Sequence, residues 1–93
     1  MIKKWLPLGT TVTLKNGNQP IMIVGRYQQN KEGQVFDYSG VLNPQGLEDA
    51  HSMYLFNESK IDHILFESEF TEYENEYIKQ LDAFISMSDN HLK

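Results

Sequence analysis

Hydrophobic residues recur at one spacing in the first two-thirds of the chain and at another in the last third. In the first part, short apolar runs alternate with polar residues and are separated by turn signals such as Asn16-Gly17, a pattern typical of β-hairpins. From Phe70 onward, apolar residues recur every three or four positions, which predicts an amphipathic helix. We therefore expect one domain in which residues 1–67 form an antiparallel sheet, residues 68–88 a C-terminal helix and residues 89–93 a frayed tail.

The β-rich part contains about five strand-like segments. They are residues 11–14, 21–29, 34–42, 53–56 and 63–67. Between the last two, Asn57 is expected to cap a single helical turn over residues 58–61. A one-turn helix at this point recurs in small SH3-like barrels. The predicted fold class is therefore α+β, a twisted sheet or SH3-like partial barrel followed by one amphipathic helix.

The C-terminal helix is expected to present an aromatic stripe. This stripe consists of Phe70, Tyr73, Tyr77, Leu81 and Phe84, and Ile78 and Ile85 widen it. Near its start, Thr71 and Glu74 form a Thr-x-x-Glu capping box. Short strands that do not close into a barrel need a cover for one face, and the stripe can supply it. The alternative is that the stripe is partly left exposed for a partner.

A glycine and an arginine interrupt the most apolar strand, where the run from Ile21 to Val24 meets Gly25 and Arg26. We interpret Gly25 as a bulge or sharp bend that ends the buried run. Across the next hairpin, Arg26 and Asp37 fall nearly opposite one another, which predicts an ion pair between them. Residues with a predicted structural role are Gly17, Gly25, Asp37, Gly40, Pro44, Gly46 and Asn57.

Composition narrows the function classes. The chain has 93 residues, 40% of them hydrophobic, which suits a single domain with one modest core. It has no cysteine, which excludes disulfides and thiolate nucleophiles and fits a reducing cytoplasm. A net charge of -5 disfavours binding to nucleic acid and to anionic membranes. Because no export signal or spanning segment is visible, we expect a cytoplasmic protein.

The residues that usually carry chemistry are scattered. His51, His63 and His91 lack neighbours at ligand spacing, so no metal site is expected. His63 follows Asp62, but adjacent strand residues point to opposite faces and cannot form a dyad. The glycines do not form a phosphate-binding loop, and the serines lack the context of a nucleophile. We predict no catalytic residue, no cofactor and no enzymatic activity.

Acidic and aromatic side chains are the candidates for contact with a partner. The stretch Glu67–Glu76 is rich in glutamate, which we interpret first as a solvated helix face and second as a docking surface for a basic partner. Aromatic residues on strands can stack nucleic-acid bases, but core packing is the favoured interpretation. Candidate partner-binding residues are Arg26, Tyr38, Tyr54, Glu69, Glu72, Tyr73, Glu76 and Tyr77.

A family resemblance rests on three stretches, "LPLGTTVTLKNGNQPIMIVGRYQ", "FDYSGVLNPQG" and "YLFNESKIDHILFE". In order and spacing they resemble a small bacterial family of unknown function, numbered four-one-seven-six. The matching positions are Gly9, Gly25, Arg26, Asp37, Tyr38, Gly40, Pro44, Gly46, Asn57 and Ile61. The resemblance covers the chain to about Glu67 and implies neither a cofactor nor a catalytic residue.

Members of that family look like cytoplasmic accessory proteins encoded in type VII secretion gene clusters of Gram-positive bacteria, beside LXG-type toxins and their small helical targeting partners. The resemblance implies a non-enzymatic adaptor or chaperone that binds such a toxin or targeting factor before export. The first alternative is an immunity protein that blocks a toxin domain with its acidic surface. An SH3-like nucleic-acid-binding module is the alternative from another class. Exposed strand edges and the aromatic stripe also suit a homodimer.

Overall fold

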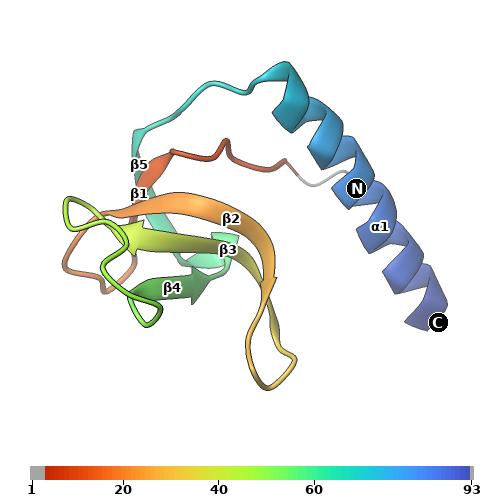
Figure 1. The fold of residues 1–93 in the computed structure, drawn as a ribbon, viewed down its shortest axis with the longest axis horizontal. Helices are drawn as coiled ribbons and strands as arrows, with labels where there is room; N and C mark the ends of the chain where they lie inside the picture. Colours follow the sequence, from red (N-terminus) through yellow and green to blue (C-terminus); the bar gives the residue numbers. More distant parts are fainter. Residues whose placement is uncertain (1–3, 93) are drawn as a thin grey trace.

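The computed structural model describes residues 4–92, with side chains up to Met87. Within these residues, five strands and a short 3₁₀ turn precede one helix (Figure 1). The elements are β1 (Thr11–Leu14), β2 (Ile21–Gln29), β3 (Val35–Leu42), β4 (Met53–Phe56), η1 (Glu58–Lys60), β5 (Ile61–Phe66) and α1 (Glu72–Leu92). The predicted α+β class, with its five strands and one C-terminal helix, is confirmed.

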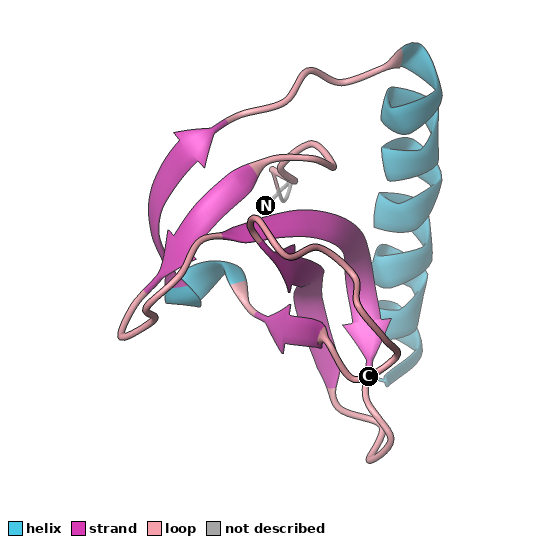
Figure 2. Ribbon diagram, turned by 60° about the vertical axis from the view of Figure 1, so that its left-hand side comes forward, coloured by secondary structure: helices cyan, strands magenta, loops and turns pink. Residues whose placement is uncertain are grey.

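The strands, drawn in magenta in Figure 2, form one open antiparallel sheet. Their order is β4-β3-β2-β1-β5. Each of the strands β1, β2 and β3 pairs in the sheet with the strand that follows it in the chain, as in successive hairpins. Asn16, in the first connection, has a positive φ of 65°, which is the conformation that its Asn-Gly signal predicts. After β4, η1 leads the chain to the opposite edge of the sheet, where β5 pairs with β1.

Asn57 holds the N-cap position of η1, but the side chain of Asp37 supplies the cap hydrogen bond. Asn57 makes no side-chain cap bond; instead its Oδ1 accepts a hydrogen bond of 3.0 Å from the N–H of Asp37. In return, Oδ2 of Asp37 accepts a hydrogen bond of 2.8 Å from the N–H of Glu58. The predicted position of the cap is therefore confirmed, but its side-chain bond comes from Asp37 and not from Asn57. The two side chains join β3 to η1 by a reciprocal exchange of hydrogen bonds.

The glycine in the apolar strand marks a bulge. The pairing of β2 with β3 shifts register between Ile23 and Gly25, as the sequence predicts, and β2 bends strongly along its length (Figure 1). A Cβ atom on Gly25 would lie 2.3 Å from Oγ of Ser39, so no larger residue fits without displacement. After the bulge, Arg26 lies opposite Tyr38.

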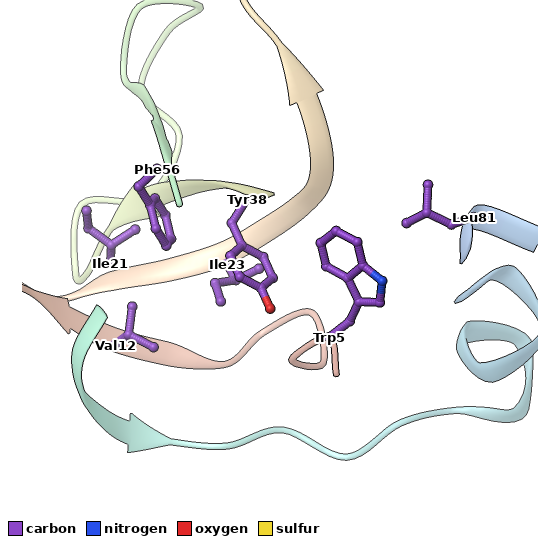
Figure 3. Packing of buried hydrophobic residues seen from close by; sticks show 7 residues of the cluster. All are labelled: Trp5, Val12, Ile21, Ile23, Tyr38, Phe56 and Leu81. Carbon is purple, nitrogen blue, oxygen red and sulfur yellow. The ribbon is translucent and has the colours of Figure 1, made fainter. Parts of the chain in front are cut away.

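The hydrophobic core is built around Tyr38 (Figure 3). It contains Trp5, Val12, Ile21, Ile23, Tyr38, Phe56 and Leu81. The ring of Tyr38 is fully buried between the rings of Trp5 and Phe56, and its hydroxyl accepts a hydrogen bond of 2.9 Å from the N–H of Leu6. Burial raises the pKa of Tyr38, so the hydroxyl stays neutral. Tyr38 is therefore a core residue and not part of a partner surface, which corrects its place among the candidates.

Helix α1 stands beside the sheet and is joined to it through the segment that precedes β1, shown in red in Figure 1. Trp5 of this segment lies between Tyr38 and Leu81 (Figure 3). Its indole N–H donates a hydrogen bond of 2.9 Å to Oδ1 of Asp82. Within the described residues, Leu81 is the one helix residue of the buried core, and Ile78 and Ile85 pack against its border.

The helix begins where its capping box predicts. Oγ1 of Thr71 accepts a hydrogen bond of 3.0 Å from the N–H of Glu74, so Thr71 is the N-cap. Residues 67–71 are not helical, and the helix therefore starts later than the predicted residue 68. Its backbone continues to Leu92. The predicted frayed tail, residues 89–93, lies beyond the last described side chain, and Lys93 is outside the described residues.

Candidate protein-binding groove

The bulge in β2 directs Arg26 toward α1. The Arg26 side chain is only 2% exposed, and its Nη2 forms an ion pair with the Glu74 carboxylate. The same nitrogen donates a hydrogen bond of 3.1 Å to the backbone oxygen of Leu6. Nε of Arg26 is buried and has no hydrogen-bond partner among the described residues. A single guanidinium thus joins β2, the N-terminal segment and α1.

Glu74 completes this junction from the helix. Its Oε2 also accepts a hydrogen bond of 2.8 Å from the N–H of Leu8. Desolvation by itself would raise the pKa of Glu74, but the hydrogen bonds from Leu8 and Arg26 and the positive charge of Arg26 hold that pKa below its ordinary value. The carboxylate therefore stays ionised near neutral pH, and its charge compensates the buried arginine.

The predicted ion pair between Arg26 and Asp37 is replaced by the pair with Glu74. Because Arg26 lies opposite Tyr38, the neighbouring Asp37 side chain points to the other face of the strand. On that face, Oδ2 of Asp37 accepts the hydrogen bond from the N–H of Glu58. The prediction was wrong because it placed the two residues opposite one another, and a shift of one residue reverses the face of the sheet.

Two hollows lie side by side where β2 and α1 face each other. Their volumes are about 640 Å³ and about 440 Å³, and Arg26, Gln28 and Tyr77 line both. The larger hollow extends to the start of α1 and includes Val24 in its wall. The smaller one extends toward Phe84, whose ring meets the ring of Tyr27 edge to face at 6.1 Å. We call the two hollows together the α1/β2 groove.

The apolar residues of α1 divide into two faces. Ile78, Leu81 and Ile85 face the core and are buried or half-buried. A second face, turned by roughly 100° on a helical wheel, carries Tyr73, Tyr77, Phe84 and Met87. These side chains are 90%, 53%, 57% and 70% exposed. The predicted stripe is therefore only partly a cover for the sheet, and we call its uncovered part the aromatic face.

The structure brings some of the candidate partner-binding residues together and separates others. Arg26, Glu69, Tyr73 and Tyr77 all line the larger hollow. The other two helix candidates, Glu72 and Glu76, are exposed, and Oε2 of Glu76 lies 3.9 Å from Nζ of Lys79. Tyr54 is half exposed on β4, at an edge of the sheet away from β2.

Glu74 is the residue of this site that sequence reasoning missed. The capping box already explains why a glutamate stands at this position of the helix. The capping box gives no indication that Glu74 also pairs with Arg26. The available signal was an acidic residue on the apolar side of the helix, next to Ile78 and opposite the solvated glutamates. Among residues 4–87, whose side chains the structure describes, no three His, Cys, Asp or Glu side chains are grouped as metal ligands would be. No helix in that range combines the length and apolar character needed to cross a membrane.

The fold and the groove define a small α+β domain whose helix is pinned to the sheet by a buried ion pair while its aromatic face stays exposed. The chain belongs to the family described as domain of unknown function DUF4176, whose model matches residues 5–77. The match includes Arg26 and Glu74 and ends at Tyr77. Searches of curated proteins and of solved structures found no match.

Proposed function

We propose that this protein is a non-enzymatic adaptor or chaperone that acts in the cytoplasm and binds a protein partner through the α1/β2 groove. The observation that carries the proposal is the aromatic face of α1. Tyr73 is 90% exposed and Phe84 is 57% exposed beside hollows of the groove. Exposed aromatic side chains grouped on one face of a small domain are typical of a binding site for another protein.

The proposed partner is an LXG-type toxin of a type VII secretion system, or one of its small helical targeting factors, bound before export. This choice rests on the gene context that the family resemblance implies. A helical partner is consistent with the groove, because an amphipathic helix can lay its apolar side against the aromatic face of α1. The proposal includes neither nucleic acid nor membrane, since the net charge of -5 repels both.

A second candidate is an immunity protein. The observation that favours it is the row of exposed acids before and along the start of α1, namely Glu67, Glu69, Glu72 and Glu76. Such a row can cover the basic active site of a toxin that acts on nucleic acid. The two candidates differ in which part of the toxin they bind.

Co-expression with separate halves of a neighbouring toxin tests the proposal. An adaptor or chaperone co-purifies with the N-terminal LXG region or with the helical targeting factor. An immunity protein co-purifies with the C-terminal toxic domain and restores the growth of cells that express it. If the protein co-purifies with none of the three, both functions are rejected.

A further inference from the structure

We infer that the α1/β2 groove receives an amphipathic helix whose apolar side is flanked by basic residues. This inference rests on the proposed function; it adds the charge of the partner segment and the reasons why a helix suits the groove better than a strand. It follows from the shape of the groove, the geometry of the β2 edge and the distribution of charge around α1.

The exposed aromatic face has the length of a helix-binding surface. From Tyr73 to Met87 the helix rises by about 21 Å. Along this length Tyr77 and Phe84 border the groove, and the facing wall is β2 from Val24 to Gln28. A helix of about four turns laid along the mouth of the groove can contact both α1 and β2 with side chains spaced three and four residues apart.

An extended strand suits this site less well, although β2 has an unpaired edge here. The pairing of β2 with β1 involves only Ile21 and Met22, so the strand beyond the bulge pairs with β3 alone. Strand addition needs regular backbone with free hydrogen-bonding groups. Tyr27 interrupts that regularity with a φ of 52°, and the carbonyl of Arg26 already accepts a hydrogen bond of 3.0 Å from Nε2 of Gln28.

The charges around the groove favour a basic partner. Glu74 is neutralised by Arg26, but Glu67, Glu69 and Glu72 are exposed and form no ion pair within the described residues. Among the described residues, Arg26 is the one basic residue that lines either hollow, and its charge is compensated by Glu74. A helix with Lys or Arg beside its apolar face therefore gains attraction near the start of α1.

Two synthetic peptides of about 18 residues test this inference directly. Both have the same leucine face, and one carries lysine and the other glutamate at the flanking positions. In a titration of the ¹⁵N-labelled full chain, the lysine peptide should shift the amide signals of Val24, Gly25, Gln28 and Tyr77, and it should bind about tenfold more tightly than the glutamate peptide. Equal affinities, no shifts at millimolar peptide, or shifts confined to β5 would overturn the inference.

Matched variants locate the contact. Phe84→Ser should weaken binding of the lysine peptide about tenfold, whereas Phe66→Ser removes a similarly exposed ring from β5 and should leave it unchanged. Glu69→Lys should weaken the same peptide, whereas Glu48→Lys makes the same charge change in a loop outside the groove. If each variant and its control lose binding equally, the groove is not the site. The native fluorescence of Trp5 and an unchanged unfolding midpoint verify that each variant is folded.

The outcomes separate this inference from the proposed function. A toxin that co-purifies equally with the wild type and with Phe84→Ser leaves the adaptor function standing and rejects the groove. Binding of the lysine peptide at the groove, combined with no co-purification of any toxin region, leaves the surface standing and rejects the secretion role.

Discussion

Arg26 of β2 and Glu74 of α1 form an ion pair between residues that are 48 positions apart in the chain. Their side chains are 2% and 11% exposed. The ion pair holds α1 to β2 near the start of the helix. The apolar contact between Trp5 and Leu81 holds the helix to the core further along. The position of α1, and with it the groove, therefore depends on Glu74.

Replacing Glu74 by glutamine should lower the free energy of unfolding by about 3 kcal/mol, because it leaves the Arg26 charge buried without compensation. Urea unfolding followed by circular dichroism measures this loss. Glu72→Gln is the control, since this neighbouring glutamate is exposed and should change stability by less than about 0.5 kcal/mol. The double variant Arg26→Leu/Glu74→Leu should recover most of the loss, because no charge then remains buried. If Glu74→Gln and Glu72→Gln have the same free energy of unfolding, the ion pair does not hold the helix.

Acid should loosen the same junction. The pKa of Glu74 is lower in the folded protein than its ordinary value of 4.5, so the ionised carboxylate stabilises the folded state above that pH. This contribution is lost as the pH falls from 4.5 through the lowered pKa, where Glu74 takes up a proton. Urea midpoints measured between pH 7 and pH 3 should fall less steeply for Glu74→Gln than for the wild type. Parallel curves would exclude Glu74 as a titrating group of the fold.

Several features of this fold could be predicted from the sequence because neighbouring residues in the chain determine them. The turn at Asn16-Gly17, the bulge at Gly25 and the N-cap at Thr71 each depend on residues within a few positions. The change of hydrophobic period likewise located α1 and the β-rich part. The sheet could be anticipated because each strand is short, apolar and bounded by turn residues.

The partners of polar side chains could not be predicted in the same way. Whether Arg26 faces Asp37 or Tyr38 depends on a register difference of one residue, and the bulge itself sets that register. The periodicity of α1 indicated a helix but not which side is covered, since both Tyr77 and Leu81 are apolar. The choice is made by Trp5, which reaches α1 from the other end of the chain and selects the side of Leu81 and Asp82.

The bond between Trp5 and Asp82 provides an internal reporter of the docking of α1. Trp5 is the one tryptophan of the chain and is buried, so its emission reports the contact without labelling. Asp82→Ala should remove about 1–2 kcal/mol of stability and make Trp5 more accessible to acrylamide, because the helix loses a charge-assisted hydrogen bond. Asp62→Ala, an exposed acid on β5, is the control and should leave quenching unchanged. Unchanged quenching in Asp82→Ala would show that the indole stays shielded without this bond.

The bulge at Gly25 should be sensitive to the addition of a single methyl group. A Cβ atom there would lie 2.3 Å from Oγ of Ser39, which is itself buried, so Gly25→Ala should lower the free energy of unfolding by about 2 kcal/mol. Because the closest atom is the Ser39 hydroxyl, Gly25→Ala/Ser39→Ala should be more stable than Gly25→Ala alone. Chemical denaturation of Gly25→Ala, Ser39→Ala and the double variant measures this rescue. If Ser39→Ala gives no rescue, the demand for glycine comes from the backbone or from Gln28, whose Cδ would lie 3.3 Å from the new atom.

Whichever contact requires the glycine, the displaced bulge in Gly25→Ala should also move Arg26 away from Glu74. A smaller effect of Glu74→Gln in the Gly25→Ala background than in the wild type would show this coupling.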